Sequence, residues 1–220
     1  MTKSKLGCLS SCRKTEEVVA IDMENTFIPL IFRMKYINRW GLKFNTQNES
    51  VMQHTAECAF IAHFLAIVGN RYFGKSYNAD KLAVAALYHD ATEVYTGDLP
   101  TPIKYFNDDM ANIYKQIEQA ASSKIMQHLP KDLQADYAIY LDGTALSDEE
   151  TKILKISDLL CAYIKCIHEI NTGNNEFRLA HEDIGKRIEN IDSSELKYFL
   201  DNCLAAFSHP LDDLKAAPEL

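Results

Sequence analysis

Apolar residues recur at helical spacing over most of the chain from about residue 50 onward, and polar caps mark where helices begin. Ser50 and Gln53 have the spacing of a capping box and predict the start of one long helix. Ser147 and Glu150 predict the start of a second one in the same way. The expected helices cover about residues 50–69, 79–94, 108–128, 147–172, 175–191 and 192–207.

The chain has few signals for strands. Alternating β-branched positions are nearly absent, and 8 Gly and 6 Pro are few for a protein that turns every ten residues or so. Residues 97–102 contain one Gly and two Pro and predict a loop. We therefore expect an all-α fold, a single helical bundle of about six main helices, over residues 23–220. Residues 1–22 lack a periodic apolar face and predict a flexible N-terminal extension.

Composition narrows the classes of partner. The 220 residues are 47% hydrophobic and 25% charged, which is typical of a globular protein. The 23 basic and 31 acidic residues give a net charge of −8, which argues against a nucleic-acid polymer or an anionic membrane as partner. The longest apolar runs are shorter than a membrane span, and no secretory signal is visible. Six unevenly spaced Cys are typical of reduced thiols, so we expect a cytoplasmic protein.

Candidate metal-binding side chains occur among apolar neighbours on three of the expected helices. His89 and Asp90 lie in the helix over residues 79–94, with Glu93 one turn beyond His89 on the same face. Asp158 lies on the apolar stripe of the helix over residues 147–172. His54 lies in the first turn of the helix over residues 50–69. Buried carboxylates require a cationic partner, which makes this combination of residues informative.

Each of these residues also has a structural explanation. His54 and His89 could be hydrogen-bonded core histidines, and Asp158 could form a local ion pair with Lys155. If the three helices converge, however, two imidazoles and two carboxylates form a mixed nitrogen and oxygen set that suits one divalent ion such as Co²⁺, Mn²⁺ or Zn²⁺. Such a set leaves coordination positions for water and substrate, as a hydrolytic site requires.

The order His54, His89-Asp90, Asp158 resembles that of the HD-domain superfamily of metal-dependent phosphohydrolases. A closer resemblance, to the bacterial YfbR-type 5′-deoxynucleotidases, covers about residues 24–215. It is carried by FRMKYINRW (32–40), YHDATEVYTGDLPTPIKYFN (88–107), LCAYIKC (160–166) and GNNEF (173–177). The resemblance implies an all-helical homodimer that hydrolyses deoxyribonucleoside 5′-monophosphates to deoxynucleoside and phosphate, with one divalent metal ion.

The resemblance also implies roles for individual residues. The implied metal ligands are His54, His89, Asp90 and Asp158, of which His54 and Asp158 also contact the substrate. Glu93 matches the acidic catalytic residue, and Arg39 and Asp98 are further catalytic candidates. The implied substrate contacts beyond those ligands are Arg39, Trp40, Asp98, Leu99, Pro100 and Thr101.

Chemistry gives these roles reasons, and alternatives stay open. Glu93 can deprotonate the attacking water, or can merely orient His89. Arg39 can hold the phosphate with two donors, or form a surface ion pair. Asp98 can bind the sugar 3′-hydroxyl, protonate the leaving 5′-oxygen, or stabilise a turn. Trp40 can wall the sugar site against a 2′-hydroxyl, or anchor the core.

Two other functions compete with this interpretation. One is another HD-domain reaction, on nucleoside triphosphates or cyclic nucleotides. A triphosphate site should contain several more cations, and Arg39, Lys43 and Lys104 are the plausible ones here. The other is a metal-binding or nucleotide-binding sensor without turnover, against which Glu93 argues.

Overall fold

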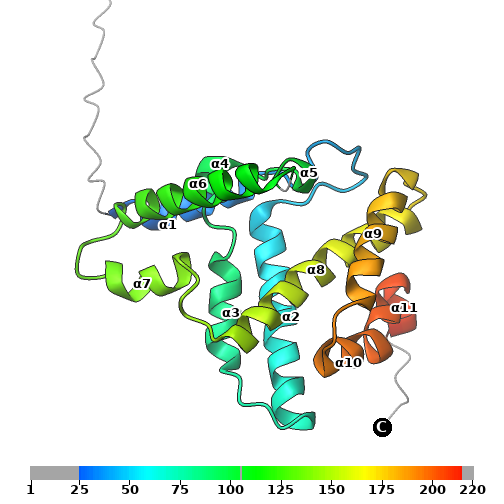
Figure 1. Ribbon diagram of the computed structural model, residues 1–220. Helices are drawn as coiled ribbons and strands as arrows, with labels where there is room; N and C mark the ends of the chain where they lie inside the picture. The colour runs from blue at the N-terminus through cyan, green and yellow to red at the C-terminus, as the bar shows by residue number, and fades with distance from the viewer. Residues whose placement is uncertain (1–24, 105, 215–220) are drawn as a thin grey trace, which may run out of the picture.

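The computed structural model describes residues 25–104 and 106–214, without the side chains of Thr101 and Leu211. Over these ranges the chain consists of helices and loops (Figure 1), and its β pairing is an isolated bridge between Asn38 and Ser50. The predicted all-α class is confirmed. The extension predicted for residues 1–22 lies outside the described residues, so the extension and the start of the domain stay predictions.

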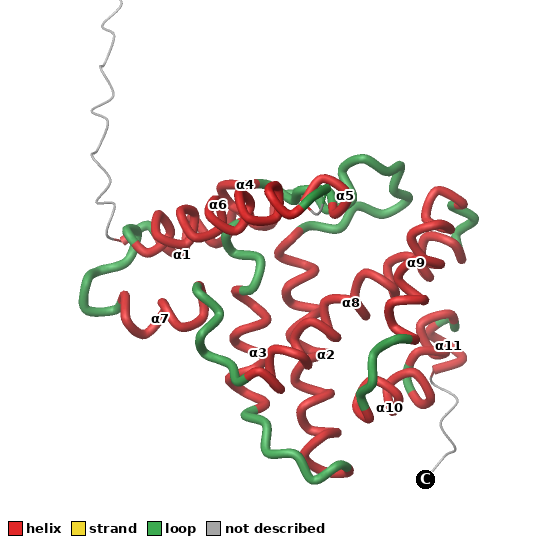
Figure 2. Tube along the Cα trace, in the orientation of Figure 1, coloured by secondary structure: helices red, strands yellow, loops and turns green. Residues whose placement is uncertain are grey.

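Two long helices, α2 (Val51–Tyr72) and α8 (Asp148–Asn171), pass through the middle of the molecule, and shorter helices surround them (Figure 2). The other α-helices are α1 (Phe27–Ile31), α3 (Ala79–Tyr88), α4 (Glu93–Thr96), α5 (Thr101–Lys104), α6 (Asp108–Met126), α7 (Gln134–Leu141), α9 (Arg178–Glu189), α10 (Ser194–Asn202) and α11 (Leu211–Leu214). The 3-10 helices are η2 (Phe32–Tyr36), η3 (Asn175–Phe177) and η4 (Leu204–Ser208).

Side-chain caps begin the central helices where the sequence predicts them. Ser50 accepts a hydrogen bond from the Gln53 backbone at 3.2 Å. Ser147 and Glu150 form a reciprocal capping box at the start of α8. At α2 the predicted box is only half formed, because the Gln53 side chain donates to Glu57 instead of returning to Ser50. Caps of this kind supply acceptors for the N–H groups that a helix start leaves unpaired.

The helix predicted over residues 79–94 is wrong in one respect. It breaks after Tyr88, and a turn through His89 leads to α4, which begins at Glu93. The helical spacing argument that placed Glu93 on the face of His89 therefore fails, although Glu93 still reaches the same region. Two further expected helices are shorter than predicted, since residues 175–177 and 204–208 are 3-10 helix, and α7 has no counterpart among the expected helices.

The core explains why α2 and α8 form the centre. One cluster of buried apolar residues includes Leu65, Leu82 and Leu160, from α2, α3 and α8. A second cluster packs α1 and η2 against the start of α2 and the end of α6, with Met34 and Ile125 almost fully buried. Each fully buried side chain of this size contributes roughly 1.5–3 kcal/mol. By length and hydropathy alone α2 could cross a membrane, but 56% of its most apolar window is buried within the protein, as in a core helix.

The cysteines that the structure describes are free thiols. Cys58, Cys161 and Cys166 are buried in the core, and Cys203 is half-buried. Their burial agrees with the expected core thiols, and Cys8 and Cys12 lie outside the described residues.

Candidate active site

A loop between η2 and α2, residues 38–50, carries the first two candidate residues, Arg39 and Trp40. The loop is closed at its neck by the bridge between Asn38 and Ser50 and by a 2.9 Å hydrogen bond from the Arg39 backbone N–H to the Glu49 carbonyl. The neck lies directly before α2, so the loop begins and ends within one helical turn of His54. Arg39 is thereby brought close to the first turn of α2.

Trp40 has a left-handed backbone, with φ of +61°, a conformation that residues other than glycine rarely adopt. Three hydrogen bonds hold it there. Its N–H donates to Asp98 Oδ2 at 3.0 Å, and its carbonyl accepts from the Lys43 N–H at 2.8 Å and from Asn45 Nδ2 at 3.3 Å. Its ring packs edge-on against Phe177, with centroids 5.2 Å apart. The indole Nε1 is buried without a hydrogen-bond partner among the described residues.

The four predicted metal ligands converge from α2, from α8 and from the turn that follows α3. His54 Nε2 lies 3.1 Å from Asp158 Oδ1 and 3.5 Å from Asp90 Oδ2, and His89 Nε2 lies 3.2 Å from Asp90 Oδ2. One ligand atom from each of His54, His89 and Asp158 can be chosen so that all lie within 4.8 Å of one another. The local ion pair considered for Asp158 is not formed with Lys155, because Asp158 faces His54 and Arg39.

The orientation of the two imidazoles suits a metal ion. His89 Nδ1 lies 2.7 Å from the Ala86 carbonyl and donates its proton to it, which leaves Nε2, directed at the Asp90 carboxylate, as the nitrogen that could bind a metal ion. Both ring nitrogens of His54 and Nε2 of His89 are buried without a hydrogen-bond partner among the described residues. Buried nitrogen atoms facing carboxylates in this way fit a divalent ion, which would bind all of them.

The charges in the cluster shift one another's ionisation. Burial opposes the charged form of Asp90, but the neighbouring His89 lowers the pKa of Asp90 well below its usual value. Burial likewise opposes a charged His54, yet the Asp158 carboxylate, 3.1 Å from its Nε2, raises the pKa of His54 to about 10. For Arg39, the charges of Glu49, Asp158 and Asp90 outweigh burial and raise its pKa further. The cluster thus stabilises positive charge.

Glu93 and Asp98 approach the cluster from α4 and the loop after it. Glu93 is buried, and its Oε2 has no hydrogen-bond partner among the described residues. Burial, together with the charges of Asp90 and Asp98, raises the pKa of Glu93 to about 9. Burial also raises the pKa of Asp98, while the nearby Arg39 opposes this shift. A carboxyl group with a raised pKa beside other carboxylates is typical of an acid or base in an active site.

The rest of the predicted substrate segment is less closely tied to the cluster. Leu99 and Pro100 are half-buried and follow Asp98 directly. Thr101 begins α5, and its side chain lies outside the described part of the structure. Within residues 98–101, Asp98 makes the contact to Trp40 that joins the segment to the 38–50 loop.

Glu49 belongs to the site and was not predicted from the sequence. Its side chain is 5% exposed, and Oε1 lies 2.5 Å from Arg39 Nη1 and 3.6 Å from His54 Nδ1. One carboxylate therefore contacts both the candidate phosphate-binding residue and a candidate metal ligand. The only sequence signal is its place just before the capping Ser50, where an acidic residue in a polar loop is typical of a solvated position.

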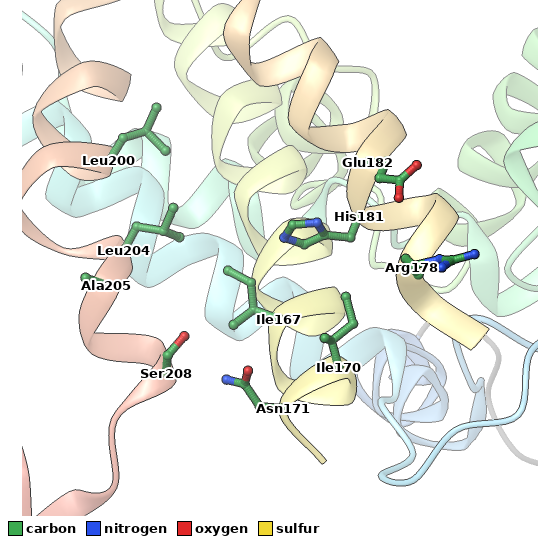
Figure 3. A pocket seen from close by; sticks show the side chains of 10 residues that line it. All are labelled: Ile167, Ile170, Asn171, Arg178, His181, Glu182, Leu200, Leu204, Ala205 and Ser208. Atoms are coloured by element: carbon green, nitrogen blue, oxygen red, sulfur yellow. The ribbon is translucent and has the colours of Figure 1, made fainter. Parts of the chain in front are cut away.

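A cavity lies elsewhere, away from the candidate site residues. It measures about 560 Å³, is formed by α8, α9, α10 and η4, and includes His181 and Arg178 among its lining (Figure 3). None of the candidate site residues lines it. A second cavity of about 420 Å³ lies beside the 38–50 loop, with the charged residues Glu49, Lys165 and Glu169 in its wall.

Comparisons with known proteins agree with this geometry. Residues 26–207 match the family described as 5′-deoxynucleotidase YfbR-like. The chain is 44% identical over 191 residues to a 5′-deoxynucleotidase of Pectobacterium atrosepticum, covering 87% of this chain and 96% of that protein. It is 45% identical over 188 residues to a 5′-deoxynucleotidase of Photorhabdus laumondii subsp. laumondii, covering 86% and 95%. Among solved structures, an HD-domain phosphohydrolase from Listeria innocua superposes with a TM-score of 0.73 at 28% identity, covering 86% of this chain and 92% of the other.

Proposed function

The chain belongs to the YfbR-like 5′-deoxynucleotidase family, and from this premise we propose how its residues carry out hydrolysis of deoxyribonucleoside 5′-monophosphates to deoxynucleoside and phosphate. The enzyme is a metal-dependent phosphoric monoester hydrolase. The observation that supports this most strongly is the convergence of His54, His89, Asp90 and Asp158 next to Arg39.

We propose His54, His89, Asp90 and Asp158 as the ligands of one divalent ion, with Co²⁺, Mn²⁺ and Zn²⁺ as the candidates. The unpartnered imidazole nitrogens support this assignment. A bound ion supplies positive charge to the phosphate and acidifies water. The chain's own residues do the rest of the chemistry.

Arg39 binds the phosphate. Its guanidinium is held by Glu49 through Nη1, while Nη2 lies 4.0 Å from Asp158. Two donors on one planar group suit two oxygens of a phosphate, and they stabilise the charge that develops as the ester bond breaks. Lys43 and Lys104 pair with Glu176 and Glu118 respectively. Of these three basic side chains, Arg39 is the one that lies beside the candidate metal ligands, which favours a monophosphate substrate over a triphosphate.

Glu93 accepts the proton of the attacking water. Its unpartnered Oε2 is buried beside the candidate ligands, and a carboxyl group with a raised pKa is a stronger base when it is deprotonated. The alternative, that Glu93 only orients His89, predicts a much smaller loss of turnover when Glu93 is replaced.

Trp40 walls the sugar site, and Asp98 holds the Trp40 backbone through Oδ2. The other Asp98 oxygen can accept a hydrogen bond from the sugar or, when protonated, donate a proton to the leaving oxygen. Leu99, Pro100 and Thr101 complete this side of the site as substrate contacts.

The family resemblance supports a homodimer, and the free thiols support action in the cytoplasm. Light scattering checks the first point, since a dimer has twice the 25.0 kDa of the chain. A mass of one chain at micromolar concentration would contradict it.

The activity is tested by measuring phosphate release from a panel of deoxyribonucleotides and ribonucleotides with each candidate metal. We expect release from dAMP and its analogues, little release from AMP, and none without metal. Binding of nucleotide without release at any metal would favour the sensor. Preferential hydrolysis of triphosphates or cyclic nucleotides would favour another HD-domain reaction.

A further inference from the structure

A buried carboxylate far from the catalytic cluster holds the 38–50 loop. Glu169 lies near the end of α8 and is 1% exposed. It accepts hydrogen bonds from the Thr46 N–H at 2.9 Å, from Thr46 Oγ1 at 2.6 Å and from the Gln47 N–H at 3.3 Å. The partners are more than 120 residues apart in sequence. Glu169 therefore fixes the far side of the loop from α8.

Two further buried residues bind Glu169 and the loop at the same time. Lys165 donates to Glu169 and to the Gln47 carbonyl, and Asn174 Nδ2 donates to Glu169 at 2.8 Å and to the Phe44 carbonyl at 2.9 Å. The loop backbone is thus held at residues 44, 46 and 47. A buried network in which every charge is paired makes the loop rigid. The same donors lower the pKa of Glu169 against the effect of burial, so it remains a carboxylate.

Residues 173–177 also contact the 38–50 loop. This segment matches the family in sequence, but the sequence alone assigns it no function. Besides Asn174, the Glu176 carbonyl accepts a hydrogen bond from Lys43 at 2.9 Å. Phe177 is fully buried and packs against the Trp40 ring. The segment therefore contacts the loop at two places: Asn174 belongs to the polar network around Glu169, and Phe177 packs against the indole ring of Trp40.

We propose that Glu169 is a positioning residue: by anchoring the 38–50 loop, it holds Arg39 and Trp40 where they meet the phosphate and the sugar. This rests on the proposed function for the roles of Arg39 and Trp40. Glu169 has no contact with the catalytic cluster, so it acts through the loop.

The test is Glu169→Gln, which keeps the size of the side chain. The amide nitrogen cannot accept the hydrogen bonds that the carboxylate accepts, and Lys165 loses its counter-charge. We expect kcat/KM for dAMP to fall about 10- to 100-fold, because small displacements of binding groups cost this much. The loss should appear mainly in KM, the preference for dAMP over AMP should fall, and the bound metal should stay unchanged.

Trp40 is the only tryptophan in the chain, so its fluorescence reports the position of the loop without any catalytic assay. In Glu169→Gln we expect its emission to shift to longer wavelength and its quenching by acrylamide to increase. If the wild-type protein released no phosphate from any nucleotide while these fluorescence changes occurred, the anchoring would be upheld and the proposed function overturned.

Glu150→Gln is the matched control. Glu150 is a buried carboxylate of the same helix, at its other end, where it accepts hydrogen bonds from the backbones of Ser147 and Asn78. Its replacement should lower thermal stability but leave kcat/KM and Trp40 fluorescence unchanged. Equal losses of activity in both variants at a temperature where both are folded would overturn the proposal.

Thr46→Val provides a second variant if Glu169→Gln does not fold. It removes the 2.6 Å hydrogen bond from Oγ1 and keeps the backbone hydrogen bond of the same residue. We expect a smaller change in the same direction, in KM and in fluorescence. Unchanged kinetics and unchanged Trp40 quenching in a folded Glu169→Gln or Thr46→Val would overturn the proposal.

Discussion

The backbone N–H of Trp40 donates a 3.0 Å hydrogen bond to Asp98 Oδ2, across 58 residues of sequence. This bond helps to hold Trp40 in a left-handed conformation that costs about 1–3 kcal/mol for a residue other than glycine. Strain of this size persists only where the surroundings impose it. Asp98 therefore fixes the backbone of Trp40 and, with it, the position of the indole ring.

This relationship separates the roles considered for Asp98. Asparagine in place of Asp98 can still accept the Trp40 hydrogen bond, whereas alanine cannot. We expect Asp98→Ala to lower kcat/KM by about 10- to 100-fold through misplacement of Trp40, and Asp98→Asn to stay within about tenfold of the wild type. Steady-state kinetics on dAMP measures both. Equal and large losses in kcat would instead show that Asp98 donates a proton to the leaving oxygen.

Trp40→Ala tests the sugar wall. Alanine has the same Cβ and suffers the same backbone strain, so the substitution removes the ring alone. An apolar wall discriminates one added hydroxyl by about 1–3 kcal/mol, which is roughly tenfold to a few hundredfold. The ratio of kcat/KM for AMP to that for dAMP should therefore rise in the variant, even if both values fall. An unchanged ratio would move the selectivity to residues 98–101.

Glu93→Ala tests the proposed base. Because Glu93 lies beside the candidate metal ligands and is not proposed as one of them, we expect the variant to keep its metal and its nucleotide affinity. Removal of a general base costs about 10²- to 10⁴-fold in kcat. Elemental analysis of the variant measures the bound metal, and a single-turnover assay measures the rate of hydrolysis. Loss of the metal would show that Glu93 is a ligand.

Glu49→Gln tests the contacts that Glu49 makes with Arg39 and with His54. The neutral amide weakens the hold on Arg39 and no longer supports the imidazole, as residues behind metal ligands commonly do. We expect metal affinity to fall by about 10- to 100-fold and the KM for dAMP to rise. Glu57→Gln, at an exposed position on α2, is the control and should change neither. Titration of metal into protein that a chelator has freed of metal measures the first effect. A metal affinity and a KM equal to those of the wild type in Glu49→Gln would contradict this role.

The sequence predicts those parts of the fold that depend on neighbouring residues. In the caps at Ser50, Asn78 and Ser147, the side chain accepts a hydrogen bond from the backbone N–H three residues later, so the pattern is visible in the sequence. The break after Tyr88 is not visible, because no Gly or Pro marks it and Ala91 and Glu93 favour helix.

The candidate site divides in the same way. Its four candidate metal ligands could be proposed from residue type, apolar surroundings and family order. Glu49 and Glu169 could not, because Glu49 lies in a loop without periodicity and Glu169 acts through contacts with that loop more than 120 residues away. A Glu side chain is most often solvated, and only the three-dimensional arrangement shows that these two are buried and paired.

The pH dependence of stability can be tested away from the active site, at Glu195. This carboxylate is 3% exposed and accepts hydrogen bonds from Ser193 Oγ at 2.7 Å and from Tyr77 OH at 3.1 Å. Burial is the largest effect and opposes its ionisation, but the hydrogen bonds from Ser193, from the backbone and from Tyr77, with the charge of Lys75, together outweigh burial and lower the pKa of Glu195. Since the folded pKa lies below the unfolded value of about 4.3, its contribution is complete above that pH and is lost as the pH falls through the folded pKa.

Glu195→Gln should therefore lower the free energy of unfolding near neutral pH by about 1–3 kcal/mol, because hydrogen bonds to a charged, buried group are lost. The difference from the wild type should narrow as the pH falls below about 4, where the wild-type carboxyl group becomes protonated too. Urea unfolding with EDTA at every pH keeps metal binding out of the comparison. Glu189→Gln, at an exposed position at the end of α9, should show almost no difference at any pH. A gap for Glu195→Gln that stays constant or widens in acid would contradict a lowered pKa, and would mean that Glu195 stabilises the fold through packing instead of charge.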